Sequence, residues 1–272
     1  MTAGGYPDAA GIGIDLEHGI LRVTLDRPQR RNALTDVMVA ALISTLERAG
    51  QDEAVRAVVL SGSGDHFCSG FDIVERNTPG DGPRPRVGSI QRRLPAQAHR
   101  LIPLVMATQV PVICAVRGWC AGIGLHLAVA ADFAVVADDA RMWEPFTARG
   151  FTPDSGATWL MPRRVGEVRA RELLLLGRAL SGREAAEWGL VHRAVPPGEL
   201  AEACDELALQ LASGPTVALG LVKLLLHRGA TSPLDAHLGD EAYAMELSSR
   251  SHDFREGLAA FKEKRPPHFE GR

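Results

Sequence analysis

The fold is decided by one stretch, in which the apolar run 110–116 (Val-Pro-Val-Ile-Cys-Ala-Val) meets the glycine-rich run Gly118-Trp119-Cys120-Ala121-Gly122-Ile123-Gly124-Leu125-His126. The short β-branched run predicts a buried strand, and residues 122–130 predict a helix of small residues deep in the core. Between them, glycines let the backbone turn sharply and leave peptide N–H groups that no ladder or helix has claimed.

A second stretch earlier in the chain repeats this pattern. The apolar run 57–60 precedes Phe67-Cys68-Ser69-Gly70-Phe71-Asp72-Ile73. We call residues 67–73 the first elbow and residues 118–126 the second elbow. Two N–H donors aimed at one point would hold a negatively charged oxygen, so the pair of elbows indicates chemistry that passes through an oxyanion.

Glycine-rich turns between a strand and a helix can also bind a dinucleotide or a phosphate. The second elbow reads G-x-x-x-G-x-G, whereas the dinucleotide fingerprint is G-x-G-x-x-G, in which each glycine has its own steric task. No Lys-Ser/Thr pair follows either elbow, which argues against a phosphate-binding P-loop. Glycines present only for tight packing remain an alternative, more credible for one elbow than for both.

Composition limits the classes of protein that fit. The chain has 272 residues, of which 46% are apolar, and a net charge of −3, which argues against a nucleic-acid partner. No apolar run approaches the roughly 20 residues needed to cross a bilayer, and residues 1–13 lack a signal-peptide pattern, so we expect a cytoplasmic protein. The histidine spacing indicates no metal site. Reduced, buried thiols are expected for the cysteines, which are Cys68, Cys114, Cys120 and Cys204.

The order of the remaining elements predicts an α/β fold that ends in helices. A hairpin is expected over 12–25, and Thr35 should cap a helix to Ala49 whose buried stripe includes Val37. Other predicted elements are a helix at 90–108, a strand at 133–136, helical structure from about 165, a capping box at 181–184 and a last strand at 191–195. After residues 196–198, helices are predicted at 198–213, 215–228, 233–248 and 252–264.

Two segments have open interpretations. Residues 77–93 are rich in proline, glycine and arginine, which is typical of a mobile loop or lid or of a solvated insertion. In the last helix, Phe254, Leu258 and Phe261 form an apolar stripe that could close on its own core or on a neighbouring subunit.

Together these motifs resemble the enoyl-CoA hydratase/isomerase (crotonase) superfamily. The similarity rests on 25–34, on both elbows, on 185–191 and on 261–265, in the family order along nearly the whole chain. It implies a crotonase-like spiral of ββα units at 1–196, forming an acyl-CoA-binding catalytic core, and a helical trimerisation and oligomerisation region at 197–272. It also implies an acyl-CoA substrate in fatty acid or aromatic acid metabolism, no cofactor beyond the CoA of that substrate, and a homotrimer or dimer of trimers.

The resemblance also assigns roles by position. The N–H groups of Phe71 and Ile123 would hold the thioester oxygen as an enolate forms. The first elbow would meet the adenine end of CoA, while Arg27 and Lys264 would contact its phosphates or remain plain solvated charges. The full set of implied substrate-binding residues is Arg27, Ser69, Gly70, Asp72, Ile73, Gly122, Phe146, Phe261 and Lys264.

The chain departs from a hydratase at two positions. Where the family's hydratases use two glutamates, it has His126 and Phe146, and Phe146 cannot transfer a proton. Glu144 lies two residues before Phe146, an offset that generally turns the side chain elsewhere. Trp119, Trp143 and Phe146 are expected to shape the acyl pocket.

Asp154 is the carboxylate that remains well placed. The pattern at 153–162 is most similar to the branch of 1,2-epoxyphenylacetyl-CoA isomerases, in which an aspartate at this position is catalytic. One carboxylate can remove a proton and return it to another carbon, and burial among Phe71, Phe146 and Trp159 would strengthen it as a base. The alternative role is a helix N-cap.

The resulting expectation is an acyl-CoA isomerase that shifts a double bond or rearranges an epoxide next to the thioester, with Asp154 as the proton carrier. Two alternatives stay open. His126 could serve as the base of a hydratase-type addition, although a core histidine is the commoner role. The missing glutamates would also suit a catalytically silent acyl-CoA-binding protein.

Overall fold

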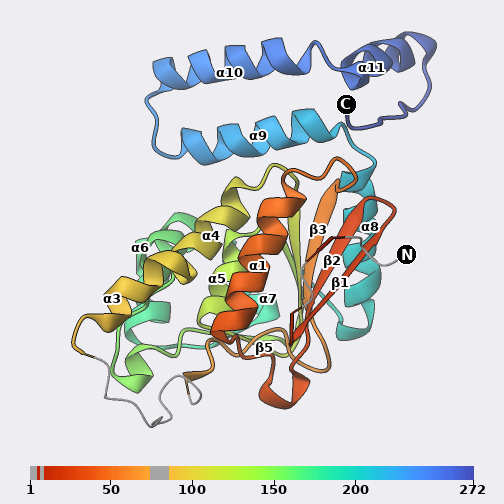
Figure 1. The fold of residues 1–272 in the computed structure, drawn as a ribbon. Coiled ribbons are helices and arrows are strands. Elements are labelled where there is room, and N and C mark those ends of the chain that lie inside the picture. Colours follow the sequence, from red (N-terminus) through yellow and green to blue (C-terminus); the bar gives the residue numbers. More distant parts are fainter. Residues whose placement is uncertain (1–4, 7–8, 74–85) are drawn as a thin grey trace.

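The computed structural model describes residues 5–6, 9–73 and 86–272. Within these residues a large sheet carries six strands in the order β1-β2-β3-β4-β6-β9 (Figure 1). The first pair is antiparallel and every later pair is parallel. The strands are β1 (Ile12–Glu17), β2 (Ile20–Leu25), β3 (Ala57–Gly62), β4 (Val112–Val116), β6 (Phe133–Ala137) and β9 (Arg193–Val195).

The chain alternates between this sheet and a smaller one. The smaller sheet has the order β5 (Trp119–Ala121), β7 (Arg141–Trp143) and β8 (Leu180–Ser181). After β4 the chain adds β5 to the small sheet and then forms the helix α5 (Ile123–Ala130). After β6 it adds β7 and then forms α6 (Ala157–Leu175). These repeats are the predicted ββα turns of a crotonase-like spiral.

The first helix confirms its predicted cap and corrects its predicted stripe. In α1 (Asp36–Ala49), the Thr35 hydroxyl accepts a hydrogen bond from the Met38 N–H, which satisfies one of the unpaired donors of the first turn. Ala41, Leu42 and Leu46 are buried, but Val37 is 61% exposed. Val37 stands in the first turn on the face that looks away from the core.

Two predicted helix boundaries are wrong. The helix expected at 90–108 is divided into α3 (Ser89–Arg93), a 3-10 turn (Leu94–Ala96) and α4 (Ala98–Ala107), because Gln97 leaves helical geometry at φ −122°, ψ −109°. Residues 77–85 of the predicted lid lie outside the described residues. Helical structure begins at Ala157 rather than near 165, and Gly166 interrupts α6 with a φ of 75°.

The helices after the last strand confirm the predicted helical C-terminus. Before that strand, the predicted capping box forms at Ser181 and Glu184, at the start of α7 (Gly182–Glu187). Next, α8 (Leu200–Ala212) packs against strands of the large sheet. The final three helices are α9 (Thr216–Gly229), α10 (Leu234–Ser248) and α11 (His252–Glu263).

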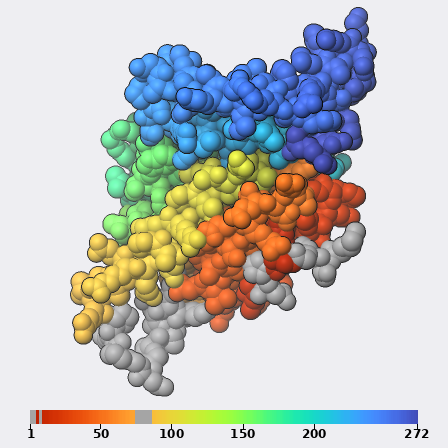
Figure 2. Space-filling model, turned by 45° about the horizontal axis from the view of Figure 1, so that its top comes forward, coloured from red at the N-terminus to blue at the C-terminus, as the bar shows by residue number. Residues whose placement is uncertain are grey.

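We call α9–α11 with the residues that follow them the C-terminal arm (216–272). Figure 2 shows it as a ledge above the yellow and orange surfaces of α4 and α1. Lys223 joins it to the core, because its buried ammonium lies 2.7 Å from an Asp132 carboxylate oxygen and donates to the carbonyls of Val105 and Val110.

All four cysteines are unpaired and buried, as expected for reduced thiols. Burial raises the pKa of the Cys68 thiol to about 12 and that of Cys204 to about 11. In the described part of the chain, no cluster of three metal-ligating side chains is found. No single described helix has the length and apolar character to cross a bilayer, although the bent pair 197–212 and 216–229 does by length and composition.

Candidate active site

The two glycine elbows lie side by side. Cys68 and Cys120 form an isolated parallel bridge, in which the Cys68 N–H donates to Trp119 O at 3.0 Å and the Ala121 N–H donates to Cys68 O at 2.9 Å. Two segments about 50 residues apart are therefore held together by backbone hydrogen bonds. The structure brings together the two turns that the sequence singled out.

The glycines at the two turns have different tasks. Gly70 and Gly122 have φ values of 106° and 54°, which residues with a side chain rarely adopt. A Cβ on Gly122 would lie 3.8 Å from the Gly70 Cα, so the two turns meet at these residues. Gly124 instead serves packing, because a Cβ there would lie 2.7 Å from the Cys68 Cβ. Packing alone thus explains one glycine of the second elbow but not the turns.

A cavity of about 620 Å³ lies where the elbows meet. Phe71 and Ile123, the two predicted oxyanion donors, both line it. Ile123 is the first residue of α5, and the first N–H groups of a helix have no acceptor within that helix. The predicted elbow residues that also line the cavity are Ser69, Gly70, Ile73 and Gly122.

Asp154 lines the same cavity and is half-buried. It is the only carboxylate among the described lining residues. The Ser155 hydroxyl lies 2.7 Å from its Oδ1, and the ring Nε2 of His99 lies 2.9 Å from its backbone carbonyl oxygen. The N-cap of α6 is Gly156, so the alternative role of Asp154 as a helix cap does not apply.

Phe146 separates the cavity from a buried pair of polar side chains. Its ring lines the cavity and stacks on the His126 ring, with centroids 5.8 Å apart and planes inclined by 9°. Behind it, the His126 Nε2 lies 3.0 and 3.1 Å from the two Glu144 carboxylate oxygens. His126 is 0% exposed and does not line the cavity, so the structure places this candidate base away from the other candidates.

The role of Glu144 was missed by sequence reasoning. A two-residue offset keeps two side chains on the same face of a regular strand, so the offset argument was wrong for a strand. Here β7 ends at Trp143, and residues 144–146 are not a strand. The signal that could have found the pair is chemical: Glu144 is an acid inside an otherwise apolar segment, and a buried carboxylate needs a partner.

Arg27 and Asp72 contact each other instead of lining the cavity. Their side chains form an ion pair at 3.1 Å, and the Arg27 guanidinium also donates to Ala33 O at 2.8 Å. These contacts tie the first elbow to the turn after β2. The prediction that Arg27 contacts CoA phosphates therefore has no support from its position, because the guanidinium is held by protein groups.

Several other predicted pocket residues lie elsewhere. Phe261 in α11 and Lys264 directly after α11 are exposed. The helix α11 lies at the far end of the molecule from α3, which borders the cavity (Figure 1). Trp119 and Trp143 pack on each other at 5.9 Å and do not line the cavity. Trp159 is 37% exposed beneath Arg163 and also lies off the cavity lining. Of the aromatic residues expected around Asp154, Phe71 and Phe146 line the cavity.

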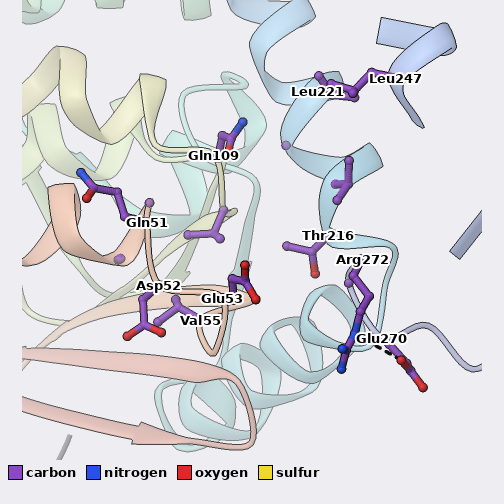
Figure 3. A pocket seen from close by; sticks show the side chains of 16 residues that line it. Gln51, Asp52, Glu53, Val55, Gln109, Thr216, Leu221, Leu247, Glu270 and Arg272 are labelled. Carbon is purple, nitrogen blue, oxygen red and sulfur yellow. Dashed lines mark ion pairs between the residues drawn. The ribbon is translucent and has the colours of Figure 1, made fainter. Parts of the chain in front are cut away.

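A second cavity, of about 490 Å³, lies between the core and the C-terminal arm (Figure 3). The end of α1, the residues before β4, α9, α10 and the last three residues line it. Asp52, Glu53 and Glu270 give it an acidic edge, and Arg272 pairs with Glu270 at 3.3 Å. None of the residues predicted for chemistry lines this cavity.

Comparison with known proteins identifies the family. The family profile described as Enoyl-CoA hydratase/isomerase matches residues 15–272. The chain is 40% identical to the 1,2-epoxyphenylacetyl-CoA isomerase of Escherichia coli (strain K12) over 258 residues, which covers 94% of this chain and 97% of that protein. It is also 40% identical to a probable enoyl-CoA hydratase of Rhodobacter capsulatus, with 96% and 98% covered.

A solved structure agrees with these matches. The putative enoyl-CoA hydratase of Streptomyces coelicolor A3(2) superposes with a TM-score of 0.90 at 34% identity, covering 100% of this chain and 98% of that chain. The spiral fold and the elbow-lined cavity define an α/β enzyme of the crotonase fold. The chain belongs to the enoyl-CoA hydratase/isomerase family, whose enzymes act on CoA thioesters.

Proposed function

We propose that this enzyme is an acyl-CoA isomerase that shifts a double bond next to a CoA thioester, or rearranges an epoxide there, with Asp154 as a single proton shuttle. The observation that carries the proposal is the composition of the cavity. Asp154 is the only carboxylate among its described lining residues, and Phe71 and Ile123 of the two elbows line it with Asp154. The similarity to an isomerase over nearly the whole chain adds support.

The proposed mechanism for a 3-enoyl-CoA follows from these groups. The Asp154 carboxylate removes a proton from the carbon next to the thioester carbonyl, and the electron pair moves onto the thioester oxygen. The N–H groups of Phe71 and Ile123 hold this oxygen as the dienolate forms. The protonated Asp154 then returns its proton two carbons further along, which completes the shift to the 2-enoyl product.

The surroundings of Asp154 suit a carboxylate that moves protons. The Ser155 hydroxyl donates to Oδ1, and no described residue donates to Oδ2, so that oxygen remains available for the substrate proton. His99 lies within hydrogen-bond distance of the Asp154 carbonyl oxygen, a contact that holds the backbone here. Arg93 and Arg149 also line the cavity and give it positive charge.

We also propose that the enzyme is a cytoplasmic homotrimer or dimer of trimers. Phe261 and Lys264 lie at the far end of the chain from the cavity, so their expected contacts with CoA would be made in the site of a neighbouring subunit. The exposed apolar side chains of the C-terminal arm support this assembly.

The test is the variant Asp154→Asn, assayed for double-bond migration in a 3-enoyl-CoA. We expect turnover to fall by about 10²- to 10⁴-fold, the usual contribution of a general acid–base. Asp205→Asn is the matched control, because Asp205 pairs with Arg22 at the surface and should leave turnover unchanged. Unchanged turnover in Asp154→Asn would contradict the role of Asp154.

The wild-type enzyme distinguishes the alternatives. A panel of enoyl and epoxy thioesters, followed by identification of the products, should show migration or rearrangement. Water addition to crotonyl-CoA that disappears in His126→Ala would favour a hydratase, although Phe146 covers the histidine. Acyl-CoA binding without turnover across the panel would identify a silent binding protein.

A further inference from the structure

The buried pair of His126 and Glu144 has no part in the proposed chemistry. The two side chains are 0% and 1% exposed, and the His126 Nε2 lies within 3.1 Å of both carboxylate oxygens. Replacing a buried polar pair by well-packed apolar residues is often neutral or stabilising, because taking polar groups out of water is unfavourable. Stability is therefore a weak explanation for this pair.

The contacts of the pair make it a poor proton carrier. Because Nε2 faces two carboxylate oxygens, it is the nitrogen that carries the hydrogen. The other ring nitrogen, Nδ1, is buried and has no hydrogen-bond partner within the described part of the chain. Phe146 stacks on the ring and stands between it and the cavity, so neither nitrogen faces a substrate.

The pair lies next to the backbone of the second elbow. His126 is in the first turn of α5, three residues after Ile123, and its N–H donates to Gly122 O at 3.0 Å. Glu144 directly follows Trp143, whose carbonyl oxygen accepts from the Gly122 N–H at 3.0 Å. The elbow is thus tied to residues 143–146 on both sides of Ile123.

Phe146 is the third contact between the same two segments. Besides stacking on His126, its ring lies against the turn, since a Cβ built on Gly122 would be 3.7 Å from the Phe146 Cζ. A shift of Glu144 relative to His126 would therefore move both the Phe146 ring, which lines the cavity, and the start of α5.

We propose that His126 and Glu144 are a positioning pair. The pair fixes the direction in which the Ile123 N–H points toward the thioester oxygen, and it fixes the plane of the Phe146 ring that lines the cavity. The inference rests on the proposed oxyanion role of Ile123. It gives the pair a task that an apolar replacement cannot perform, because dispersion contacts do not fix direction as a hydrogen bond does. Misplacement by about 1 Å can reduce turnover by about 100-fold.

The test uses acetoacetyl-CoA, a β-ketoacyl thioester whose enolate absorbs in the near ultraviolet. An aligned donor raises the enolate fraction of the bound thioester, and this signal does not require isomerisation. In the double variant His126→Leu/Glu144→Leu, we expect at least about a tenfold smaller enolate-to-keto ratio. A similar fall in kcat for a 3-enoyl-CoA should accompany it, with KM changed less and Tm close to that of the wild type.

Glu144→Gln is the conservative variant, because its carbonyl oxygen still accepts from Nε2, and it should recover most of the enolate signal. If the double variant does not fold, His126→Asn replaces it, since the shorter amide does not span to Glu144 and should show the same loss. Leu173→Ala is the stability control: it removes a buried side chain of α6 that does not line the cavity, so Tm should fall with the enolate signal retained.

The outcomes separate this inference from the proposed function. The positioning role is overturned if the double variant, or His126→Asn where it replaces the double variant, keeps the enolate signal of the wild type. It is also overturned if the wild-type enzyme does not raise the enolate fraction of bound acetoacetyl-CoA. If the wild type stabilises the enolate but does not move double bonds, the isomerase proposal fails while the positioning pair can still be upheld.

Discussion

The region around the cavity and the C-terminal arm differ in how much of their apolar surface is buried. Around the cavity, all eight residues of α5 are buried, and His126 and Glu144 pair with each other inside the core. On the arm, large side chains face solvent, with Leu226 74% and Tyr243 79% exposed. Large exposed apolar patches mark interaction sites, so the arm is where we expect contact with another chain.

The difference separates the predicted functional residues into two groups. Phe71, Ile123 and Asp154 lie together in one chain, so their joint action can be tested in that chain alone. Phe261 and Lys264 lie on the arm, and neither lines this cavity in the same chain. Substitutions at the cavity and on the arm should therefore have separable effects.

After Asp154→Asn, the largest effect is expected at the second elbow. Ile123→Pro removes the donor N–H, and proline is well tolerated at the first position of a helix. We expect kcat to fall by about 10²- to 10³-fold, or about 2.7–4 kcal/mol of transition-state stabilisation. The control is Ile123→Val, which keeps the N–H. A proline variant as active as the valine variant would remove Ile123 from the oxyanion site.

The next effect concerns assembly through the arm. Leu226→Asp places a charge where we expect a neighbouring subunit, and burial of a leucine is worth about 1.5–3 kcal/mol. The mass of the assembly, measured by sedimentation or light scattering, should therefore fall. Val37→Asp is the matched control, because Val37 is 61% exposed in the first turn of α1, where an acid suits the helix dipole. A monomeric wild type would contradict the prediction.

A smaller effect is expected from Lys264→Ala. Loss of one exposed contact to a CoA phosphate should raise KM by roughly threefold to tenfold, or up to about 1.4 kcal/mol, with kcat unchanged. Lys262→Ala, two residues earlier in the last turn of α11, should leave KM unchanged. Mixed assemblies of Asp154→Asn and Lys264→Ala chains should exceed the average of the two at low substrate, because some sites then combine both intact residues. A mixture equal to the average would place Lys264 outside the neighbour's site.

The smallest effect is expected at the end of the arm. Glu256 accepts from Arg265 at 2.6 Å and from the His268 N–H at 2.7 Å, and these contacts lower its pKa to about 2. Because the folded-state pKa lies below the unfolded value, the contribution to stability is complete above about pH 4.5 and is lost as pH falls toward 2. The Tm difference between wild type and Glu256→Gln should therefore shrink between pH 6 and pH 3. A difference independent of pH would contradict the ion pair.

The parts of the fold and of the site that could be predicted from the sequence are those with a local physical cause. Thr35 and Ser181 caps depend on residues three positions away, and the turns at Gly70 and Gly122 depend on a left-handed φ that favours glycine. The less predictable parts depend on contacts across the fold. Arg27 looked like a phosphate ligand, yet it pairs with Asp72, 45 residues away.

Glu144 and Val37 show that sequence periodicity alone does not fix the environment of a side chain. Alternation within a strand says where a side chain points only while the strand continues, and β7 ends before Glu144. Helical periodicity placed Val37 on the buried stripe, but no other described element covers that part of α1.

The sequence by itself determined the strand–turn–helix units, the two elbows, the C-terminal helices and the resemblance to one enzyme family. These follow from backbone freedom, capping and hydrophobic periodicity, which act over a few residues. Only the tertiary structure decided that Asp154 shares the cavity with Phe71 and Ile123, and that His126 turns to Glu144 behind Phe146. Burial and partners decide what an ionisable side chain can do, and both are set by elements that are distant in the chain.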